Sequence, residues 1–404
     1  MKKKFSLLTV IVSVAVAMIV TFNCTFVIMN VQHNKEINDL MTQNGYLTSL
    51  LTVDQVIREN YLGDIDDAEL KNSVIRGYLS GIGDKYGQYM SSEEYAAYLA
   101  EFQGNAVGIG VNVIFDLVSN TIEVIDVIPD SPAEKSGILV GDFIVAVDGT
   151  KVTEAGYYTS VDLIKGDKGT SVTITVNRDG VESDVVCIRD SVAVVTVKHR
   201  VYSKDPTIGV IRISSFYAET PAEFKASVED LKGKGCTKFV FDLRNNGGGE
   251  LNSILTTLDY LLPAGKLAYI RYASGDEVSF DSKDSFLDAS VAVLVNENTA
   301  SAAELFAAAL RDYAKDGKYS ATLVGNTTYG KGVFQSMYLL PDGSAFKFTT
   351  GRYDPPCGVN YDGVGVVPDN IVDLSEEAQK IGFYKLTDDD DNQLQVAANV
   401  LAAK

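Results

Sequence analysis

The sequence predicts a multidomain α/β protein with an N-terminal membrane anchor, and three observations support this fold class. Strand-like and helix-like segments alternate from about Lys198 to Asp373, which is typical of a layered α/β domain. A β-rich module extends from Gly104 to about Arg189, and a long apolar stretch opens the chain. The length of 404 residues and the hydrophobic content of 46% allow a sizeable core and suggest two to three domains.

Residues 1–32 are predicted to form the anchor. Three lysines at positions 2–4 precede an apolar stretch from Phe5 to about Val31, and roughly 20 apolar residues are enough to cross a bilayer. The positive flank should stay in the cytoplasm and place the rest of the chain outside. A cleaved signal peptide shares this pattern and would give a secreted form. No clear A-x-A site follows the stretch, so an uncleaved anchor is favoured.

Residues 33–103 are polar and have the pattern of two or three short amphipathic helices. Apolar side chains recur there at helical spacing: Val53, Val56 and Ile57, then Val74, Tyr78 and Leu79. The segment Gly83–Gly87 interrupts this pattern, and Ser91 and Ser92 restart a helix.

Residues 104–190 are predicted to form the β-rich module. Ala106–Ile114 and Thr121–Ile128 alternate like strands, and Phe143–Val147 reads as a third strand. Between them, Ser131 followed by a proline starts a short helix that Gly137 ends, because serine caps helix N-termini and glycine adopts the left-handed conformation at their C-termini.

Residues 191–374 carry the alternating segments, and residues 375–404 are predicted to form a helical tail. The alternating segments are Ile208–Ile213, Pro221–Leu231, Phe239–Leu243, Leu251–Leu262, Val291–Val295, Ala302–Tyr313 and Thr322–Val324. In the tail, the acidic run Asp388–Asp391 is expected to be a solvated segment rather than a metal site.

Composition excludes several classes of function. The net charge of -19 argues against nucleic acid or an anionic membrane surface as a ligand of the folded part. Four cysteines and two histidines are scattered without metal-ligand spacing, so we expect no zinc site and no other cofactor. Cys187, Cys236 and Cys357 lie in unrelated segments, which predicts no structural disulfide framework.

The candidate chemistry is concentrated in two segments, N-T-A-S-A-A-E with Ser301 and T-Y-G-K-G-V-F-Q with Lys331 and Gln335. Neither histidine is well placed to activate a serine, and lysine is the chemical alternative as a base. Burial can lower a lysine pKa by about 3–5 units, and Gln335 could hold the neutral amine without recharging it. Each segment also has a structural reading: Ser301 with Glu304 can be a helix capping box, and G-K-G can be a surface turn.

A third segment is D-L-R-N-N-G-G-G at residues 242–249. It follows the apolar strand Phe239–Phe241 and precedes the helix-like Leu251–Leu262, so it predicts a strand-to-helix turn with exposed backbone N–H groups. It lacks the G-K-[ST] ending of a phosphate-binding loop and the G-x-G-x-x-G spacing of a dinucleotide site. Such a loop can direct donors at a developing oxyanion, although a purely structural turn is the alternative.

Together the three segments resemble the carboxy-terminal processing peptidases, also called tail-specific proteases. The resemblance implies that Ser301 is the nucleophile, that Lys331 is its base and that Gln335 orients the lysine. It implies an oxyanion hole formed by the N–H of Ala302 and that of Gly247 or Gly248. The family fold is crotonase-like, and the segment Tyr361–Asp369 is similar to its closing G-[IV]-x-P-D motif.

The resemblance covers roughly Val53 to Val372 and departs from the family in one place. The span between Ser301 and Lys331 includes Asp312–Tyr319, which looks about five residues longer than is usual in the family. We expect it to lengthen a surface helix or loop.

The β-rich module resembles a PDZ domain through the string S-P-A-x-x-S-G-I-x-x-G-D-x-I-x-x-V-D-G. The segment Gly108, Ile109, Gly110 and Val111 matches the loop that captures a peptide's terminal carboxylate in such domains. The alternative is a closed module that serves only as a spacer.

The sequence therefore predicts a membrane-tethered serine endopeptidase that acts outside a bacterial cytoplasmic membrane. Its expected partners are protein or peptide substrates with free, unstructured C-termini, which the PDZ domain would bind. The helical region could mediate a homodimer, as it often does in the family, or could pack against the chain's own domains. The alternative function is a non-catalytic PDZ scaffold or holdase. An enoyl-CoA-processing enzyme is disfavoured because acidic catalytic residues and a CoA site cannot be found.

Overall fold

The computed structural model describes residues 45–403 apart from 103–104, 117–118 and 284–285. The chain divides into two compact units, residues 1–71 and 72–404. The predicted anchor at residues 1–32 lies outside the described residues. Across the helices that are described, none is both long and apolar enough to span a bilayer.

The first unit contains α2 (Gly45–Asn60) and the start of α3 (Asp67–Gly81). The predicted amphipathic helices are confirmed here, but α2 has no buried residue. Val53 and Val56 are each 53% exposed. The apolar stripe that predicted this helix therefore has no covering partner within the described part of this unit.

The second unit begins within α3 and continues through β1 (Gln88–Met90) and α4 (Ser92–Phe102). The predicted interruption is confirmed, because Gly83 has a φ of 75° and ends the helix. The short strand β1 was not predicted. It pairs with β18 (Ala345–Asp354), which lies far along the sequence.

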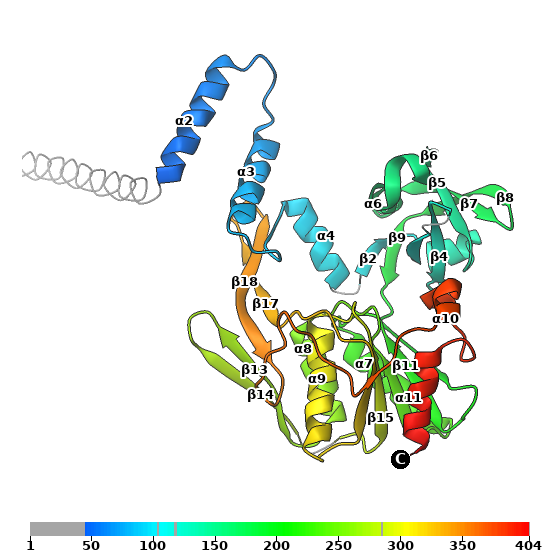
Figure 1. Cartoon of the computed structure of the whole chain (residues 1–404). Helices are drawn as coiled ribbons and strands as arrows, with labels where there is room; N and C mark the ends of the chain where they lie inside the picture. Colours follow the sequence, from blue (N-terminus) through cyan, green and yellow to red (C-terminus); the bar gives the residue numbers. More distant parts are fainter. Residues whose placement is uncertain (1–44, 103–104, 117–118, 284–285, 404) are drawn as a thin grey trace, which may run out of the picture. The chain divides into compact units, whose positions relative to one another are not determined.

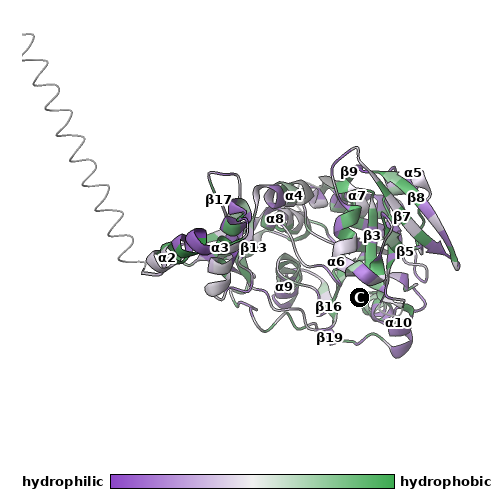
Figure 2. Cartoon of the chain, turned by 90° about the horizontal axis from the view of Figure 1, so that it is seen from above, coloured by the Kyte–Doolittle hydropathy of each residue, from purple (hydrophilic) through white to green (hydrophobic). Residues whose placement is uncertain are grey.

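The β-rich module folds as a sheet with the strand order β3-β4-β5-β7-β8. Its strands are β3 (Val111–Asp116), β4 (Thr121–Val127), β5 (Phe143–Val147), β7 (Ser171–Arg178) and β8 (Val181–Ile188), with β6 (Thr150–Lys151) beside β5. Two helices accompany it, α5 (Pro132–Ser136) and α6 (Val152–Ile164). The predicted caps of α5 are confirmed, since Ser131 accepts from Glu134 N and Gly137 has a φ of 85°. Figure 2 shows hydrophobic residues along the strands β3, β5 and β7.

One predicted strand of this module is wrong. Ala106–Ile114 is interrupted at Gly110, whose φ is 84°. The part before the break is β2 (Asn105–Gly108), which pairs with β9 (Asp190–Ala193) in a separate ribbon, and the part after it is β3. A Cβ at Gly110 would lie 2.3 Å from the Cβ of Ser131, so only glycine fits this turn.

The alternating region builds a central sheet with the order β10-β11-β12-β15-β16-β19. These strands are β10 (Val197–Val201), β11 (Ile208–Ile213), β12 (Lys238–Asp242), β15 (Ser290–Val295), β16 (Ala321–Gly325) and β19 (Asn370–Ile371). All neighbouring pairs are parallel except β10 with β11. The apolar runs that predicted these strands are explained by burial on both faces of a parallel sheet.

Successive side chains of these strands enter two different cores. Phe239 and Phe241 pack with residues of α7 (Thr220–Gly233), α8 (Leu251–Leu261) and α9 (Ala302–Lys315). Val240 packs on the other face with residues of α11 (Asn392–Ala402). In Figure 1, α7, α8 and α9 lie on one side of this sheet and α11 on the other.

A second, antiparallel sheet was not predicted. Its order is β1-β18-β13-β14, with β17 also paired to β18. The additional strands are β13 (Gly265–Tyr272), β14 (Glu277–Ser282) and β17 (Val333–Leu339). Lys331 precedes β17 and Gln335 lies within it, so this sheet positions the second candidate segment.

The tail after residue 374 contains α10 (Glu376–Ile381), a 3-10 helix at Phe383–Lys385 and α11. The expectation that Asp388–Asp391 is a solvated run is wrong for two of its residues. Asp388 and Asp391 are 8% and 4% exposed. Asp388 accepts from Ser203 N and pairs with Arg200, because the run packs on the peptidase region instead of extending into solvent.

Candidate active site

Ser301 occupies a strained turn between β15 and α9. Its φ of 58° and ψ of −124° are uncommon for a residue with a side chain, and such strain tends to occur at functional sites. Its Oγ is hydrogen-bonded to the Oη of Tyr353 at 2.6 Å. His199 is bonded elsewhere, with its Nε2 2.8 Å from Asp230 Oδ2. Sequence analysis did not find Tyr353, although it lies in a segment with strand-like alternation.

The glycine loop packs directly against this turn. Thr299 donates its hydroxyl to Leu243 O at 2.8 Å, and the N–H of Ala300 donates to Asn246 O at 2.9 Å. At Gly248, where φ is 104°, a Cβ would lie 2.9 Å from the Cβ of Ser301 and 3.0 Å from Ala302 N. The predicted strand-to-helix turn is confirmed, and it brings Gly248 rather than the exposed Gly247 against the serine.

The buried carboxylate of Glu304 joins the two candidate segments. It accepts from the backbone N–H of Ser301 at 2.8 Å, Gly330 at 2.7 Å and Lys331 at 2.8 Å. It also accepts from the hydroxyl of Thr328 at 2.5 Å. Glu304 is fully buried, so these four donors replace the water that a carboxylate otherwise requires. The sequence indicated only a capping residue.

Lys331 follows a glycine that adopts the tight bend expected from the sequence. Gly330 has a φ of 87° and its Cβ position lies 3.0 Å from the backbone nitrogens of Val364 and Gly365. Burial, followed by the charge of Lys347, lowers the pKa of the Lys331 ammonium. The direction of this shift is the one that a lysine base needs.

The side chain of Lys331 lies against an aromatic ring and is not hydrogen-bonded to Ser301. Its Nζ lies 4.3 Å from the centroid of the Tyr86 ring. Among the hydrogen bonds of the described residues, none joins Lys331 Nζ to Ser301 Oγ. Gln335 does not hold the amine either: its Nε2 donates to Thr349 Oγ1 at 3.3 Å, and no hydrogen bond of the described residues joins its Oε1 to Lys331 Nζ.

A small loop before β1 contacts both Thr349 and Lys331. Asp84 accepts from the backbone N–H of Thr349 at 2.6 Å and from its hydroxyl at 3.1 Å. Tyr86, two residues later, supplies the ring beneath Lys331. The series of hydrogen bonds from Gln335 through Thr349 to Asp84 therefore ends near the lysine, and none of these bonds involves the lysine amine.

Tyr353 lies between the two candidate segments. Its Oη is 3.3 Å from Lys331 O as well as 2.6 Å from Ser301 Oγ. Burial raises the pKa of Tyr353, so this phenol is neutral at working pH. Its ring stacks on Phe334 of β17, with the centroids 6.3 Å apart.

Comparisons with known proteins decide the family. The model of peptidase family S41 matches residues 207–372, and a PDZ domain model matches residues 123–178. A carboxy-terminal-processing protease of Bartonella bacilliformis is 33% identical over 326 residues, covering 78% of this chain and 73% of the relative. The chain belongs to peptidase family S41. This S41 peptidase is a serine protease related to the carboxy-terminal-processing proteases, and it carries a PDZ domain.

Further relatives agree with this assignment. A probable CtpA-like serine protease of Staphylococcus saprophyticus is 30% identical over 371 residues, covering 89% of this chain and 73% of the relative. The solved photosystem II D1 C-terminal processing protease is 27% identical with a TM-score of 0.50, over 80% of this chain and 86% of its own. A putative S41 protease from Bacteroides fragilis shares the fold, with a TM-score of 0.58 at 16% identity. The match covers 87% of this chain and 97% of that protein.

In the PDZ domain of this S41 peptidase, the segment Gly108–Val111 links β2 to β3. Two of its carbonyls have partners within the module: Ile109 O accepts from Ala133 N at 2.7 Å and Gly110 O accepts from Ile128 N at 3.0 Å. Strand β3 ends the sheet order, so one of its edges pairs with β4 and the other with no strand of the described chain. Helix α6 reaches that side, where the hydroxyl of Tyr157 donates to Val113 O at 3.4 Å.

The arginine of the D-L-R-N-N-G-G-G segment anchors the tail of the S41 peptidase. Arg244 donates to both oxygens of Asp242, at 2.9 and 2.8 Å, and to both oxygens of Asp391, at 3.0 and 2.7 Å. It also donates to Gln393 Oε1 at 3.0 Å. All four residues are at most 5% exposed, so the start of the glycine loop is fixed by the tail.

Proposed function

We propose that this S41 peptidase cleaves polypeptides through an acyl-enzyme on Ser301, with Lys331 as its general base. The neutral amine of Lys331 takes the hydroxyl proton as Oγ attacks the scissile carbonyl. The resulting ammonium then gives this proton to the leaving amine, and the acyl-enzyme is hydrolysed by a water that the same amine deprotonates. Gln335 is assigned to orienting the amine.

The Glu304 carboxylate carries this proposal. It bonds the backbone N–H groups of both Ser301 and Lys331, at 2.8 Å each, so one buried group fixes the start of both side chains. A structural cap accounts for the bond to Ser301, but neither a cap nor a surface turn would require the bond to Lys331, which spans 27 residues of sequence. The lowered pKa of Lys331 and the strained backbone of Ser301 support the same roles.

Catalysis requires an exchange of partners. Lys331 Nζ must leave the ring of Tyr86, and Ser301 Oγ must leave Tyr353, before the amine and the hydroxyl can meet. We assign the described arrangement to an enzyme without substrate. Both changes are side-chain rotations, since Glu304 holds the two backbone segments in place.

The oxyanion hole is assigned to the N–H of Ala302 together with a glycine of the loop. Gly248 is favoured over Gly247 because a Cβ at Gly248 would lie within 3.0 Å of Ser301 and Ala302, whereas a Cβ at Gly247 would meet nothing within 4 Å. Its N–H now donates to Asn246 Oδ1 at 2.8 Å. The oxyanion would therefore share this donor with Asn246 or displace the amide oxygen.

The PDZ domain is proposed to bind the unstructured C-termini of substrates. The uncovered edge of β3 can accept an extended peptide by main-chain hydrogen bonds, and Gly108–Val111 can capture its carboxylate. The present bond from Tyr157 to Val113 O lies on this edge, so a bound peptide would displace it.

The location and assembly of the enzyme are also proposals. The apolar stretch Phe5–Val31 and its lysines support an anchor that leaves the catalytic part outside the cytoplasm. The exposed stripe of α2, with Val53 and Val56, supports a homodimer through the helical region.

Incubation of residues 32–404 with β-casein tests the proposed chemistry. Wild type should cleave β-casein, and Ser301→Ala and Lys331→Ala should not. The double variant should lose no more activity than either single variant, because the members of a dyad act as a unit. Labelling by a fluorophosphonate reports the serine independently of any substrate. Equal cleavage by wild type and Ser301→Ala would contradict the proposal.

A further inference from the structure

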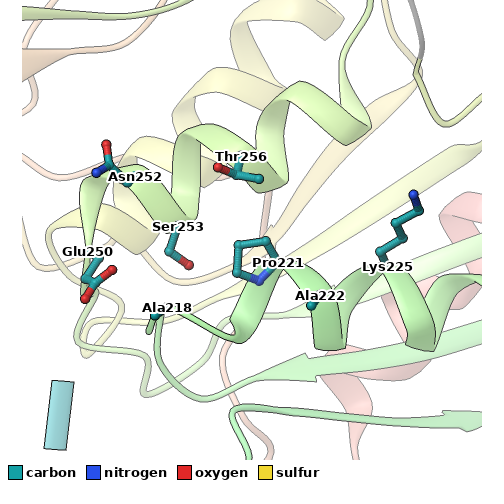
Figure 3. A pocket seen from close by; sticks show the side chains of 8 residues that line it. All are labelled: Ala218, Pro221, Ala222, Lys225, Glu250, Asn252, Ser253 and Thr256. Atoms are coloured by element: carbon teal, nitrogen blue, oxygen red, sulfur yellow. The ribbon is translucent and has the colours of Figure 1, made fainter. Parts of the chain in front are cut away.

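A cavity of about 510 Å³ lies between the first turns of α7 and α8, and no step of the proposed chemistry uses it. One wall is formed by Ala218, Pro221 and Ala222, and the other by Glu250, Asn252 and Ser253. Figure 3 shows these two walls facing each other across the gap between the helices. We call this cavity the α7–α8 pocket.

The pocket begins beside the oxyanion loop. Glu250 follows Gly248 by two residues, which is at most about 7 Å of chain. Gly248 lies so near Ser301 that a Cβ on it would be 2.9 Å from the Cβ of the serine. The opposite wall is fixed to the same loop, because Phe216 N donates to Gly248 O at 2.9 Å and Glu250 N donates to Phe216 O at 2.7 Å. An extended substrate advances about 3.3 Å per residue, so side chains within about three residues of the scissile bond can reach the mouth.

A buried hydroxyl in this pocket has no partner. Ser253 is 2% exposed, and its Oγ makes no hydrogen bond within the described structure. In Figure 3 its oxygen points between the helices toward Pro221. A buried hydroxyl without a partner costs about 1–3 kcal/mol, so an unpaired one in a cavity wall indicates a group kept for a ligand.

The charges around the pocket select against charged ligands. Glu250 and Lys225 both line it, and no ion pair among the described residues joins them. A charged side chain would be attracted by one of them and repelled by the other. The methyl groups and the proline ring of the α7 wall favour an apolar body instead.

We propose that the α7–α8 pocket binds an uncharged substrate side chain, with an apolar body and a hydrogen-bonding end, within about three residues of the scissile bond. The pocket would set which bonds are cut, while the PDZ domain selects the tail. This inference rests on the proposed proteolysis for its role but not for its binding, and the two can be tested apart.

Photo-crosslinking tests binding without cleavage. In the Ser301→Ala background, p-benzoylphenylalanine replaces Lys225, and in a matched control it replaces Lys318. Both lysines are exposed, and each has its Nζ 5.8 Å from a tyrosine ring centroid. Lys318 lines a separate cavity of about 660 Å³. We expect casein to crosslink several-fold more at position 225. Equal yields would overturn the proposal, whether or not wild type cleaves casein.

Mapping of casein cleavage sites by mass spectrometry tests specificity. Ala222→Trp fills the pocket and should change the residues found next to the cleaved bonds, whereas Ala314→Trp, about 18 Å along α9 from Ala302, should not. Ser253→Ala should cause a smaller change in the same direction and replaces Ala222→Trp if that variant does not fold. An unchanged cleavage map with an active wild type would overturn the pocket's role while leaving the proteolysis intact. If wild type is inactive but casein still crosslinks at position 225, the proposed proteolysis is refuted and the proposed binding site is supported.

Discussion

Ser301 Oγ lies 2.6 Å from the hydroxyl of Tyr353, a residue that is 52 positions away in the sequence. The proposed base has a different partner, because Lys331 Nζ lies over the ring of Tyr86. The proposed nucleophile and the proposed base are thus each held by a tyrosine, and Glu304 fixes the backbone beneath both. In the proposed mechanism, activation requires two side-chain exchanges rather than a movement of the two segments.

Tyr353→Phe should release the serine. The ring can still stack on Phe334, but Ser301 Oγ loses its partner. We expect several-fold faster labelling by a fluorophosphonate and a loss of about 1 kcal/mol in the free energy of unfolding. The control is Tyr338→Phe, on the same sheet but exposed. Slower labelling of Tyr353→Phe would show that the phenol activates the serine rather than restraining it.

The activity should depend on pH through Lys331. Its pKa is lowered by burial, and only the neutral amine can act as a base. Labelling and cleavage should therefore increase with pH in proportion to the deprotonated fraction and become constant above the lowered pKa. Lys331→Arg should be inactive at every pH, because guanidinium stays charged. A pH-independent rate would contradict the assignment.

The same lowered pKa affects stability. The unfolded chain binds more protons than the folded one between the folded pKa and the unperturbed value of about 10.4, so this group's contribution to stability rises with pH across that window. Below this window the lysine is charged in both the folded and the unfolded chain, so the full free-energy cost of burying its charge lowers the stability. Lys331→Met should therefore unfold at a higher temperature than wild type at neutral pH, with a difference that shrinks toward pH 10. A constant difference across this range would argue against burial as the cause.

Glu304→Gln should loosen the junction between the two segments. One carboxylate oxygen becomes an NH₂ group that faces N–H or hydroxyl donors, so at least one of the four bonds is lost. We expect a loss of about 1–3 kcal/mol in the free energy of unfolding and a lower kcat with little change in KM. Thermal unfolding and casein kinetics measure both. A variant with normal kcat would remove Glu304 from the catalytic arrangement.

Asp391→Asn tests the attachment of the tail. It removes the charge that faces Arg244 but keeps the helix cap on Leu394. We expect a loss of about 1.5–3 kcal/mol and faster proteolysis within residues 375–404. The matched control is Asp389→Asn, whose carboxylate is exposed and pairs with Lys204 at the surface, where an ion pair contributes about 0–1 kcal/mol. Equal effects of the two variants would be inconsistent with a buried anchor.

The PDZ domain should prefer free C-termini. In the Ser301→Ala background, a peptide that ends in a free carboxylate should bind more tightly than its amide, as measured by fluorescence anisotropy. Tyr157→Phe should strengthen the binding of both peptides. The reason is that a bound peptide would no longer have to displace the Tyr157 hydroxyl from Val113 O. Equal affinity for acid and amide would show that Gly108–Val111 captures no carboxylate.

Much of this protein was determined by sequence patterns of short range. The parallel strands were predictable because burial on both faces makes each a continuous apolar run, as in Phe239–Phe241. The caps of α5 and the glycine turns were predictable because they depend on φ at single residues. The candidate catalytic segments were recognisable by residue type and order, and the comparisons confirmed the family.

The tertiary structure alone decided which side chains meet. The antiparallel sheet places Tyr353 on Ser301, and Asp391 reaches Arg244 across 147 residues, so neither contact has a local sequence signal. The acidic run was expected in solvent because charge patterns carry no information about a distant arginine that buries them. Likewise, the direction of the Lys331 side chain depends on Tyr86, which arrives from a loop some 245 residues earlier. Local propensity fixes backbone conformation, whereas side-chain partners are chosen by packing between segments that the sequence keeps far apart.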